Sequence, residues 1–326
     1  MRAATMIHRL IEQFPSNKAD RRRSHGCCVL TLACLFLSTN LHAGATAMAI
    51  DADDVIAAMD ASLTEDTNTW SGVECNGVYK PLSALINRSV RGTERQGSNS
   101  LRLGRTPDPL NGSRMVMGFR VDQDDALTAG ARRCELAAYN SPQNAIPARQ
   151  RVWYAFSLLA DKASSRLERD DQLLTQWHVR GFLGFSPFMA LYVSNGILRF
   201  EVRHNSLAAG TPMDTRKEVL WRAPLATPAR WTNFVVEARI SPLITDRPFI
   251  RIWQDGRLIV DHAGPIGYNT EAMAFAKIGL YHWINANNEW DAAVPVRSAY
   301  FAKALLVRDT NGRYSEALLR RQLEKP

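Results

Sequence analysis

Short segments of alternating apolar and polar residues, each bounded by turn residues, occupy most of this 326-residue sequence. A period of two is typical of β-strands that bury one face. Asn195-Gly196 and Asp255-Gly256 each join two such segments, and these dipeptides strongly favour two-residue hairpins. Because no helices alternate with the strands, the pattern predicts an all-β protein, an antiparallel sandwich or jelly roll. The predicted strands are 100–104, 114–121, 151–159, 173–179, 188–193, 198–204, 231–240, 249–254, 257–260, 274–281 and 296–307.

Two short peripheral helices are predicted, one on each side of the strand-rich region. Residues 51–63 place Val55, Met59 and other apolar residues at helical spacing, with acidic residues in the first turn. Residues 315–325 have the same character, and Ser315 is suited to the N-cap.

The first residues resemble a secretory signal peptide. Arg21 to Arg23 are followed by an apolar run over residues 27–38. A run of this length matches a signal peptide and is shorter than the roughly 20 residues that a stable membrane span needs. We expect residues 1–43 to be removed after Ala43, with cleavage after Ala47 as the alternative. A retained N-terminal anchor and a lipoprotein modified at Cys34 are the competing interpretations. The sequence therefore predicts a periplasmic or secreted protein without membrane contact.

The remaining residues, 44–326, are expected to form a single domain, because no linker or repeat divides them. Removal of residues 1–43, which carry six basic and two acidic side chains, lowers the formal net charge from +8 to +4. This charge is too small for a nucleic-acid-binding domain but suits an anionic substrate held at a local patch. Cys75 and Cys134 remain, and in an oxidising compartment they either pair or stay as two buried thiols. No Cys/His spacing typical of a metal site is present, so no metal ligands are predicted.

Three of the expected strands carry polar residues two positions apart, which places them on one face of a sheet. These residues are Arg133 and Glu135 on the first strand, Gln176, His178 and Arg180 on the second, and Lys277 and Tyr281 on the third. Gly279 lies between the last two, and we expect its missing side chain to let a ligand approach the backbone. Such a face suits a binding or catalytic site.

These strands resemble the signature strands of the jelly-roll polysaccharide lyases, R-x-E-L, Q-x-H and K-x-G-x-Y, in the same order along the chain. The stretch from Arg133 to Val307 is most similar to the family that includes heparin lyase I, and the alginate and glucuronan lyases share the three motifs. The resemblance implies a concanavalin-like jelly-roll sandwich that acts on an anionic, uronic-acid-containing polysaccharide. It implies no organic cofactor, although relatives can carry a structural calcium ion, and we expect a monomer.

The resemblance also implies roles for four residues. Such lyases act by β-elimination: a base removes the C5 proton of a uronate, and an acid protonates the glycosidic oxygen that leaves C4. Arg133 and Gln176 match the positions that hold the uronate carboxylate and stabilise the developing charge. His178 and Tyr281 match the acid and the base, in an order that depends on the stereochemistry of the uronate.

Other residues are candidates for substrate binding. Lys277 is expected either to lower the pKa of the catalytic tyrosine or to bind an anionic group. Arg180 and Arg203 are expected to bind the polyanion, and Trp283 either stacks on a sugar ring or packs in the core. His282 stands where several relatives carry another polar or basic residue, which changes the surroundings of the catalytic tyrosine.

Two other functions compete with a lyase. A glycoside hydrolase on the same sandwich needs two carboxylates that face each other, about 5–5.5 Å apart for retention of configuration, and the sequence contains no E-x-D-x-x-E run. A non-catalytic lectin-like protein would use the same face, but binding alone requires no acid–base pair such as His178 and Tyr281. Within the lyases, the modest charge favours glucuronan or alginate over highly sulfated heparin.

Overall fold

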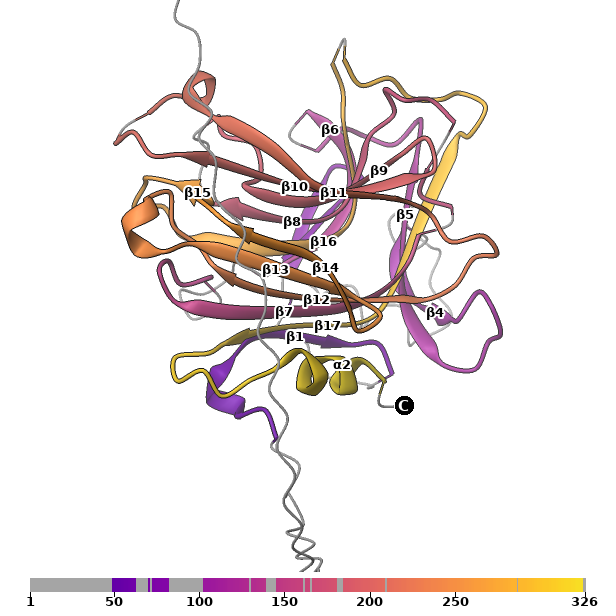
Figure 1. The fold of residues 1–326 in the computed structure, drawn as a ribbon. Helices are drawn as coiled ribbons and strands as arrows, with labels where there is room; N and C mark the ends of the chain where they lie inside the picture. Colours follow the sequence, from indigo (N-terminus) through magenta and orange to yellow (C-terminus); the bar gives the residue numbers. More distant parts are fainter. Residues whose placement is uncertain are drawn as a thin grey trace, which may run out of the picture. The chain divides into compact units, whose positions relative to one another are not determined.

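Two β-sheets stacked face to face make up most of the described chain, which confirms the predicted all-β sandwich (Figure 1). The computed structural model describes residues 49–62, 70, 72–81, 102–128, 130–138, 145–160, 162–164, 166–180, 184–208, 210–285 and 287–324. The predicted signal peptide and its cleavage sites lie outside these residues.

One sheet has eight strands in the order β14-β13-β12-β7-β17-β5-β4, with β1 also paired to β17. Every pairing in it is antiparallel. The strands are β1 Val55–Asp60, β4 Leu103–Pro107, β5 Met115–Asp122, β7 Arg151–Leu159, β12 Thr232–Arg239, β13 Phe249–Gln254, β14 Arg257–Ala263 and β17 Val296–Arg308.

The other sheet has nine strands in the order β11-β10-β9-β8-β16-β6-β2-β3. The short β15 pairs with β10 in parallel, and the remaining pairings are antiparallel. The strands are β2 Gly72–Cys75, β3 Val78–Pro81, β6 Ala131–Ala137, β8 Gln172–Val179, β9 Met189–Ser194, β10 Ile197–Asn205, β11 Arg216–Pro224, β15 Gly267–Tyr268 and β16 Ala274–Trp283.

Apolar side chains from both sheets fill the space between them. Trp177 of β8 is fully buried, and its ring lies 5.8 Å from that of Tyr154 on β7. Leu136, Ile278 and Leu280 belong to the same core cluster. Because side chains alternate along a strand, the residues next to these in β6, β8 and β16 face outward. The core thus fixes which face of the nine-stranded sheet carries the polar motif residues.

Two-residue hairpins form where the sequence predicts them. Asn195 and Gly196 have φ of 46° and 68°, and Asp255 and Gly256 have φ of 50° and 83°, as a type I′ turn requires. These turns join β9 to β10 and β13 to β14.

The helix predicted over residues 51–63 is wrong. A 3₁₀ turn, η1 (Ala52–Asp54), leads directly into strand β1. This strand pairs with the C-terminal half of β17, with Val55 opposite Val307 and Asp60 opposite Lys303. A short apolar run fits either period, and here the backbone hydrogen bonds offered by β17 override the local helical preference.

The predicted C-terminal helix is confirmed as α2 (Glu316–Glu324). Ser315 caps it, since its Oγ accepts a hydrogen bond from the backbone N–H of Leu318 at 3.4 Å. Leu318, Leu319 and Leu323 pack against Trp153 and neighbouring residues on the outer face of the eight-stranded sheet (Figure 1). In the described part of the chain, no helix has the length and apolar character needed to cross a membrane.

Candidate active site

A cleft of about 710 Å³ lies on the outer face of the nine-stranded sheet. The three motif strands are neighbours there, with β16 between β8 and β6. The predicted site residues that line the cleft are Arg133, Gln176, His178, Arg203, Lys277, Tyr281 and Trp283. The structure therefore brings seven of the eight predicted residues into one cavity.

The strand register explains why these side chains meet. Tyr281 lies opposite Arg133, and Lys277 lies opposite both Gln176 and Ala137. Side chains directly opposite on neighbouring strands share a face. Accordingly, the Arg133 guanidinium lies over the Tyr281 ring, 4.2 Å from its centroid.

A cluster of two carboxylates and two cations lies at the floor of the cleft, with Glu135 buried beneath the three residues that line it. One oxygen of Glu74, Oε2, lies 2.8 Å from Arg133 Nη1 and 2.7 Å from Lys277 Nζ. Glu135 Oε2 is more distant from the same two groups, at 3.6 and 3.8 Å. Burial alone would raise the pKa of Glu74, but Lys277 and Arg133 hold it below its ordinary value. Glu74 is therefore the charged partner of both cations.

Gln176 is fixed by the second carboxylate of this cluster. Its Nε2 donates to Glu135 Oε1 at 2.5 Å, which fixes the amide plane. Burial raises the pKa of Glu135, although Lys277 and Arg133 oppose the shift. The Gln176 side chain thus enters the cleft in a defined orientation.

His178 is held in one tautomer by its own strand. Its Nδ1 lies 2.7 Å from the carbonyl oxygen of Val179. Because a carbonyl only accepts, Nδ1 carries the proton and Nε2 keeps its lone pair. Burial lowers the pKa of His178, the hydrogen bond to Val179 opposes the shift, and Lys277 and Arg133 lower the pKa further. At neutral pH the ring is therefore uncharged and able to accept a proton.

Tyr281 has the opposite character. Burial raises its pKa above the ordinary value, and the nearby Arg133 only partly offsets this. The hydroxyl is therefore protonated at neutral pH and can donate. Of the two roles expected for Lys277, the structure does not favour a lowered pKa of Tyr281, because Lys277 binds Glu74 and Arg133 is the cation over the tyrosine ring.

An aromatic wall continues from Tyr281 along the cleft. Trp283 is half-buried, its ring stacks 6.2 Å from that of Tyr281, and it meets Tyr192 edge-on at 6.0 Å. The Tyr192 hydroxyl accepts a hydrogen bond from Arg203 Nη1 at 2.9 Å. Arg203 is also paired with Glu201 at 3.1 Å, so part of its charge is already balanced.

Arg180 is not brought into the cleft. Strand β8 ends at Val179, and Arg180 is exposed beyond the residues that line the cavity. The regular alternation that would have placed it beside His178 stops one residue earlier. Its predicted contact with the polyanion is therefore not supported by its position.

The role predicted for Gly279 is also wrong. Its φ is 133°, and a Cβ at this position would lie 2.2 Å from the Cys134 carbonyl oxygen and 2.8 Å from a ring carbon of Phe119. Both atoms belong to the packing of β16 and not to the cleft. The pairing of β16 with β8 shifts register between Ile278 and Tyr281. Glycine is required here so that β16 can bend closely against β6.

His282 points away from the substrate side. It is buried, and its Nδ1 lies 2.7 Å from Gln172 Nε2 and 3.5 Å from Asp170 Oδ1. Burial lowers the pKa of His282 to about 4, against the opposing charge of Asp170. His282, where several relatives carry another residue, therefore lies behind the cleft and does not line it.

Cys75 and Cys134 form a disulfide, so of the two alternatives the paired state is present. Their Cα atoms are 4.0 Å apart, slightly closer than the usual range of about 4.4–6.8 Å. The two residues are directly opposite in β2 and β6, where antiparallel strands approach most closely. The bond places Glu74, one residue before Cys75, beside the residues on either side of Cys134.

Glu74 and Tyr192 are two of the cleft residues that the sequence analysis missed. Asn76-Gly77 joins β2 to β3 with φ of 45° and 76°, and this hairpin signal marks Glu74 as a strand residue. No local signal connects it to Arg133. Tyr192 alternates with core residues in β9, and its position on the outer face could have been deduced from that strand.

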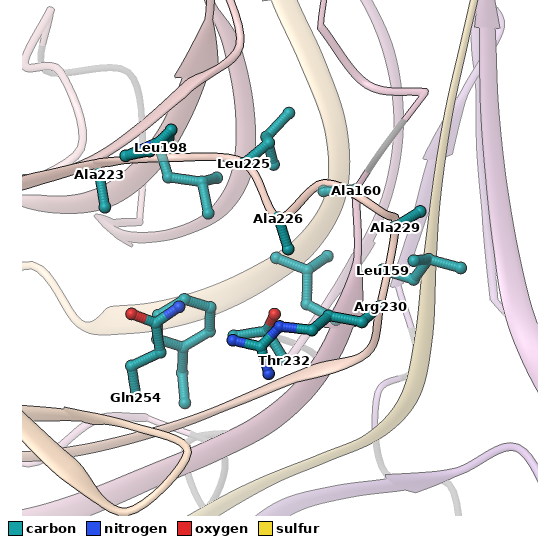
Figure 2. Close-up of a pocket in the computed structure, with 13 residues that line it drawn as sticks. Leu159, Ala160, Leu198, Ala223, Leu225, Ala226, Ala229, Arg230, Thr232 and Gln254 are labelled. Atoms are coloured by element: carbon teal, nitrogen blue, oxygen red, sulfur yellow. The ribbon is translucent and has the colours of Figure 1, made fainter.

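A second cavity, of about 220 Å³, shares no lining residue with the cleft. Figure 2 shows that leucine and alanine side chains make up much of its wall, with Arg230 among them. Arg230 is paired with Asp255 at 3.0 Å. Because the residues that line it include no histidine, carboxylate or tyrosine, this cavity lacks an acid–base pair.

The fold and the cleft define a β-sandwich protein with a proton acceptor and a proton donor in one cavity. The sequence profile of the family described as polysaccharide lyase matches residues 64–303. The chain belongs to this polysaccharide lyase family, as its three strand motifs imply. The narrower resemblance to heparin lyase I stays a prediction. A comparison with curated protein sequences gives no match.

Solved structures that resemble this chain include other lyases. An endo-β-1,4-glucuronan lyase from the fungus Trichoderma reesei is 12% identical, with a TM-score of 0.50, over 66% of this chain and 89% of that one. An alginate lyase from Pseudomonas aeruginosa is 14% identical, with a TM-score of 0.46, over 74% of this chain and 100% of that one.

Within the described residues, no three His, Cys, Asp or Glu side chains are grouped to hold a metal ion.

Proposed function

We propose that this polysaccharide lyase cleaves a uronic-acid polymer of low charge density, such as glucuronan or alginate, in the cleft between β6 and β10. The observation that carries the proposal is the pairing of two complementary groups in one cavity. His178 presents an unprotonated Nε2, and Tyr281 presents a protonated hydroxyl. Binding alone would need neither group.

The residues of the cleft suit each step of the elimination. Arg133 and Gln176 hold the uronate carboxylate and stabilise the charge that develops on it. For a uronate whose C5 proton faces His178, Nε2 takes that proton, the electron pair forms the C4–C5 double bond, and the C4–O bond breaks. Tyr281 gives its proton to the departing glycosidic oxygen. The products are a new chain end and an unsaturated uronate.

The charge of the cleft supports a uronan over a sulfated polymer. Arg133 and Lys277 are balanced by Glu74 and Glu135, and Arg203 is paired with Glu201. A polymer with one carboxylate per sugar needs few unpaired cations, whereas each added sulfate needs another.

A screen of purified glucuronan, alginate and heparin tests the proposal. We expect ultraviolet absorbance from the unsaturated ends with glucuronan or alginate, and weaker or no signal with heparin. Mass spectrometry of the digest then distinguishes the mechanisms, since fragments heavier by one water would mean hydrolysis. Binding of these polymers without any cleavage would support the lectin-like alternative.

Export to the periplasm or the outside of the cell is part of the proposal. The predicted signal peptide and the Cys75–Cys134 disulfide support it, because disulfides persist in oxidising compartments.

The pH dependence of the reaction should follow the shifted pKa values of His178 and Tyr281. His178 acts when neutral, and its pKa is lowered, so we expect kcat/KM to fall on the acid side only below about pH 6.5. Tyr281 acts when protonated, and its raised pKa delays the alkaline loss to above about pH 10. Initial rates from pH 4 to pH 11 check both limbs. An acid limb well above pH 6.5 would remove His178 as the base.

A further inference from the structure

We propose that Glu74 is a positioning residue that holds Arg133 and Lys277 in place beneath the substrate. In this inference it acts through the two cations that it binds, and not by direct contact with the uronate carboxylate or the reacting proton. The inference deepens the proposed function and rests on it.

The first argument is geometric. A single carboxylate oxygen of Glu74 lies within hydrogen-bonding distance of both Arg133 Nη1 and Lys277 Nζ, and the Glu74 side chain is buried. β2 is fixed to β6 on the C-terminal side of Glu74 by the Cys75–Cys134 disulfide and by the hydrogen bond from the Asn76 N–H to the Arg133 carbonyl at 3.2 Å. The carboxylate is therefore held on a rigid support.

The second argument is that Glu135 cannot replace Glu74. Its Oε2 lies 3.6 and 3.8 Å from Arg133 and Lys277 and makes no hydrogen bond, while its Oε1 accepts from Gln176. Loss of the Glu74 charge would leave two buried cations with one distant carboxylate. An uncompensated buried charge is strongly unfavourable unless the side chain moves or loses its proton. Arg133 cannot lose its proton, so its guanidinium should move.

The third argument connects this movement to the chemistry. The Arg133 guanidinium packs on the Tyr281 ring and faces the same cleft as Gln176. A displaced guanidinium would misplace the substrate carboxylate and change the electrostatic surroundings of the Tyr281 hydroxyl. A displacement of an active-site group by about 1 Å can lower the rate by ~10²-fold.

The test is Glu74→Gln, which keeps the shape of the side chain and removes its charge. We expect kcat to fall by about 10- to 100-fold with KM within about threefold, because ground-state binding also uses other contacts. The charged groups that face His178 and Tyr281 are Glu74, Glu135, Arg133 and Lys277. Removing one negative charge favours the deprotonated forms, so both pH limbs should move to lower pH by about one unit.

Glu237→Gln is the matched control. Glu237 is also buried, with 4% exposure, and it pairs with two arginines, Arg151 at 3.2 Å and Arg251 at 3.3 Å, but it lies in β12 of the other sheet. We expect both Glu237→Gln and Glu74→Gln to lose stability, but in Glu237→Gln both limbs of the pH–rate profile should stay at their wild-type positions. Glu74→Asp restores the charge with a shorter side chain. Both limbs of its pH–rate profile should therefore return to the wild-type positions, while its kcat stays at least about fivefold below that of the wild-type enzyme.

Unmoved limbs and wild-type kcat in Glu74→Gln would overturn the inference, as would a profile identical to that of Glu237→Gln. If circular dichroism shows that Glu74→Gln does not fold, Glu74→Asp decides: reduced kcat supports the inference, and wild-type kcat overturns it. The proposed function fails separately, when the wild-type enzyme releases no unsaturated ends from any uronic-acid polymer.

Discussion

Tyr281→Phe should lower kcat by about 10²–10⁴-fold while glycan binding stays within a few fold, because general acid–base groups contribute this much to turnover. The change removes only the hydroxyl, so the stacking of the ring between Arg133 and Trp283 persists. Stopped assays of unsaturated-end formation give kcat, and calorimetric titration with an uncleaved oligosaccharide gives the binding constant.

Tyr192→Phe provides the comparison within the same cleft. Its hydroxyl bonds to Arg203 and faces no acid–base partner, so we expect at most a tenfold effect, expressed mainly in KM. Equal losses of kcat in the two variants would mean that Tyr281 serves only to line the cleft. His178→Ala should reproduce the loss seen for Tyr281→Phe if the two groups act in one step.

Gly279→Ala should destabilise the fold by at least about 3 kcal/mol, which is large for a single methyl group. The added carbon would lie 2.2 Å from the Cys134 carbonyl oxygen, and the φ of 133° is one that alanine rarely adopts. β16 would have to separate from β6, and with it Lys277 and Tyr281 would move. Denaturant unfolding followed by circular dichroism measures the loss.

Gly196→Ala distinguishes the effect of backbone strain from that of a steric clash. Gly196 also has a positive φ, 68°, but nothing lies within 4 Å of the position that a Cβ would take. We expect a loss of about 1–2 kcal/mol, the cost of the left-handed conformation alone. If Gly279→Ala is no worse than Gly196→Ala, the close approach of β16 to β6 is not what requires the glycine.

Local patterns allowed much of the sheet to be predicted. Asn195-Gly196 and Asp255-Gly256 marked the turns between their strands, and strands β7 and β13 begin and end where the sequence indicates. Strand β11, Arg216–Pro224, was missed because most of its side chains are exposed or half-buried at a sheet edge, so it lacks the apolar alternation of an inner strand. β1 was assigned to a helix because its pairing with β17 is not encoded locally.

The motif strands allowed most of the cleft to be predicted, but not its support. Period two placed Gln176 with His178 and Lys277 with Tyr281 on one face. The ion pairs of Glu74 could not be deduced, since they join residues 59 and 203 positions apart in the chain. Gly279 was misjudged because a glycine in a strand suits either a ligand or a neighbouring backbone, and only the three-dimensional structure distinguishes them.

The place of β16 in its sheet also bears on how the enzyme is made. The strand that carries Lys277 and Tyr281 lies between β6 and β8, although it follows β8 in the sequence by more than ninety residues. Until residues 274–283 have joined the sheet, Arg133 and His178 lie on strands with no partner between them. Contacts at such sequence separation form slowly. Catalytic competence should therefore appear late in refolding, after the local hairpins, and the unpaired inner edges of β6 and β8 are the surfaces that a nascent chain must keep from aggregating.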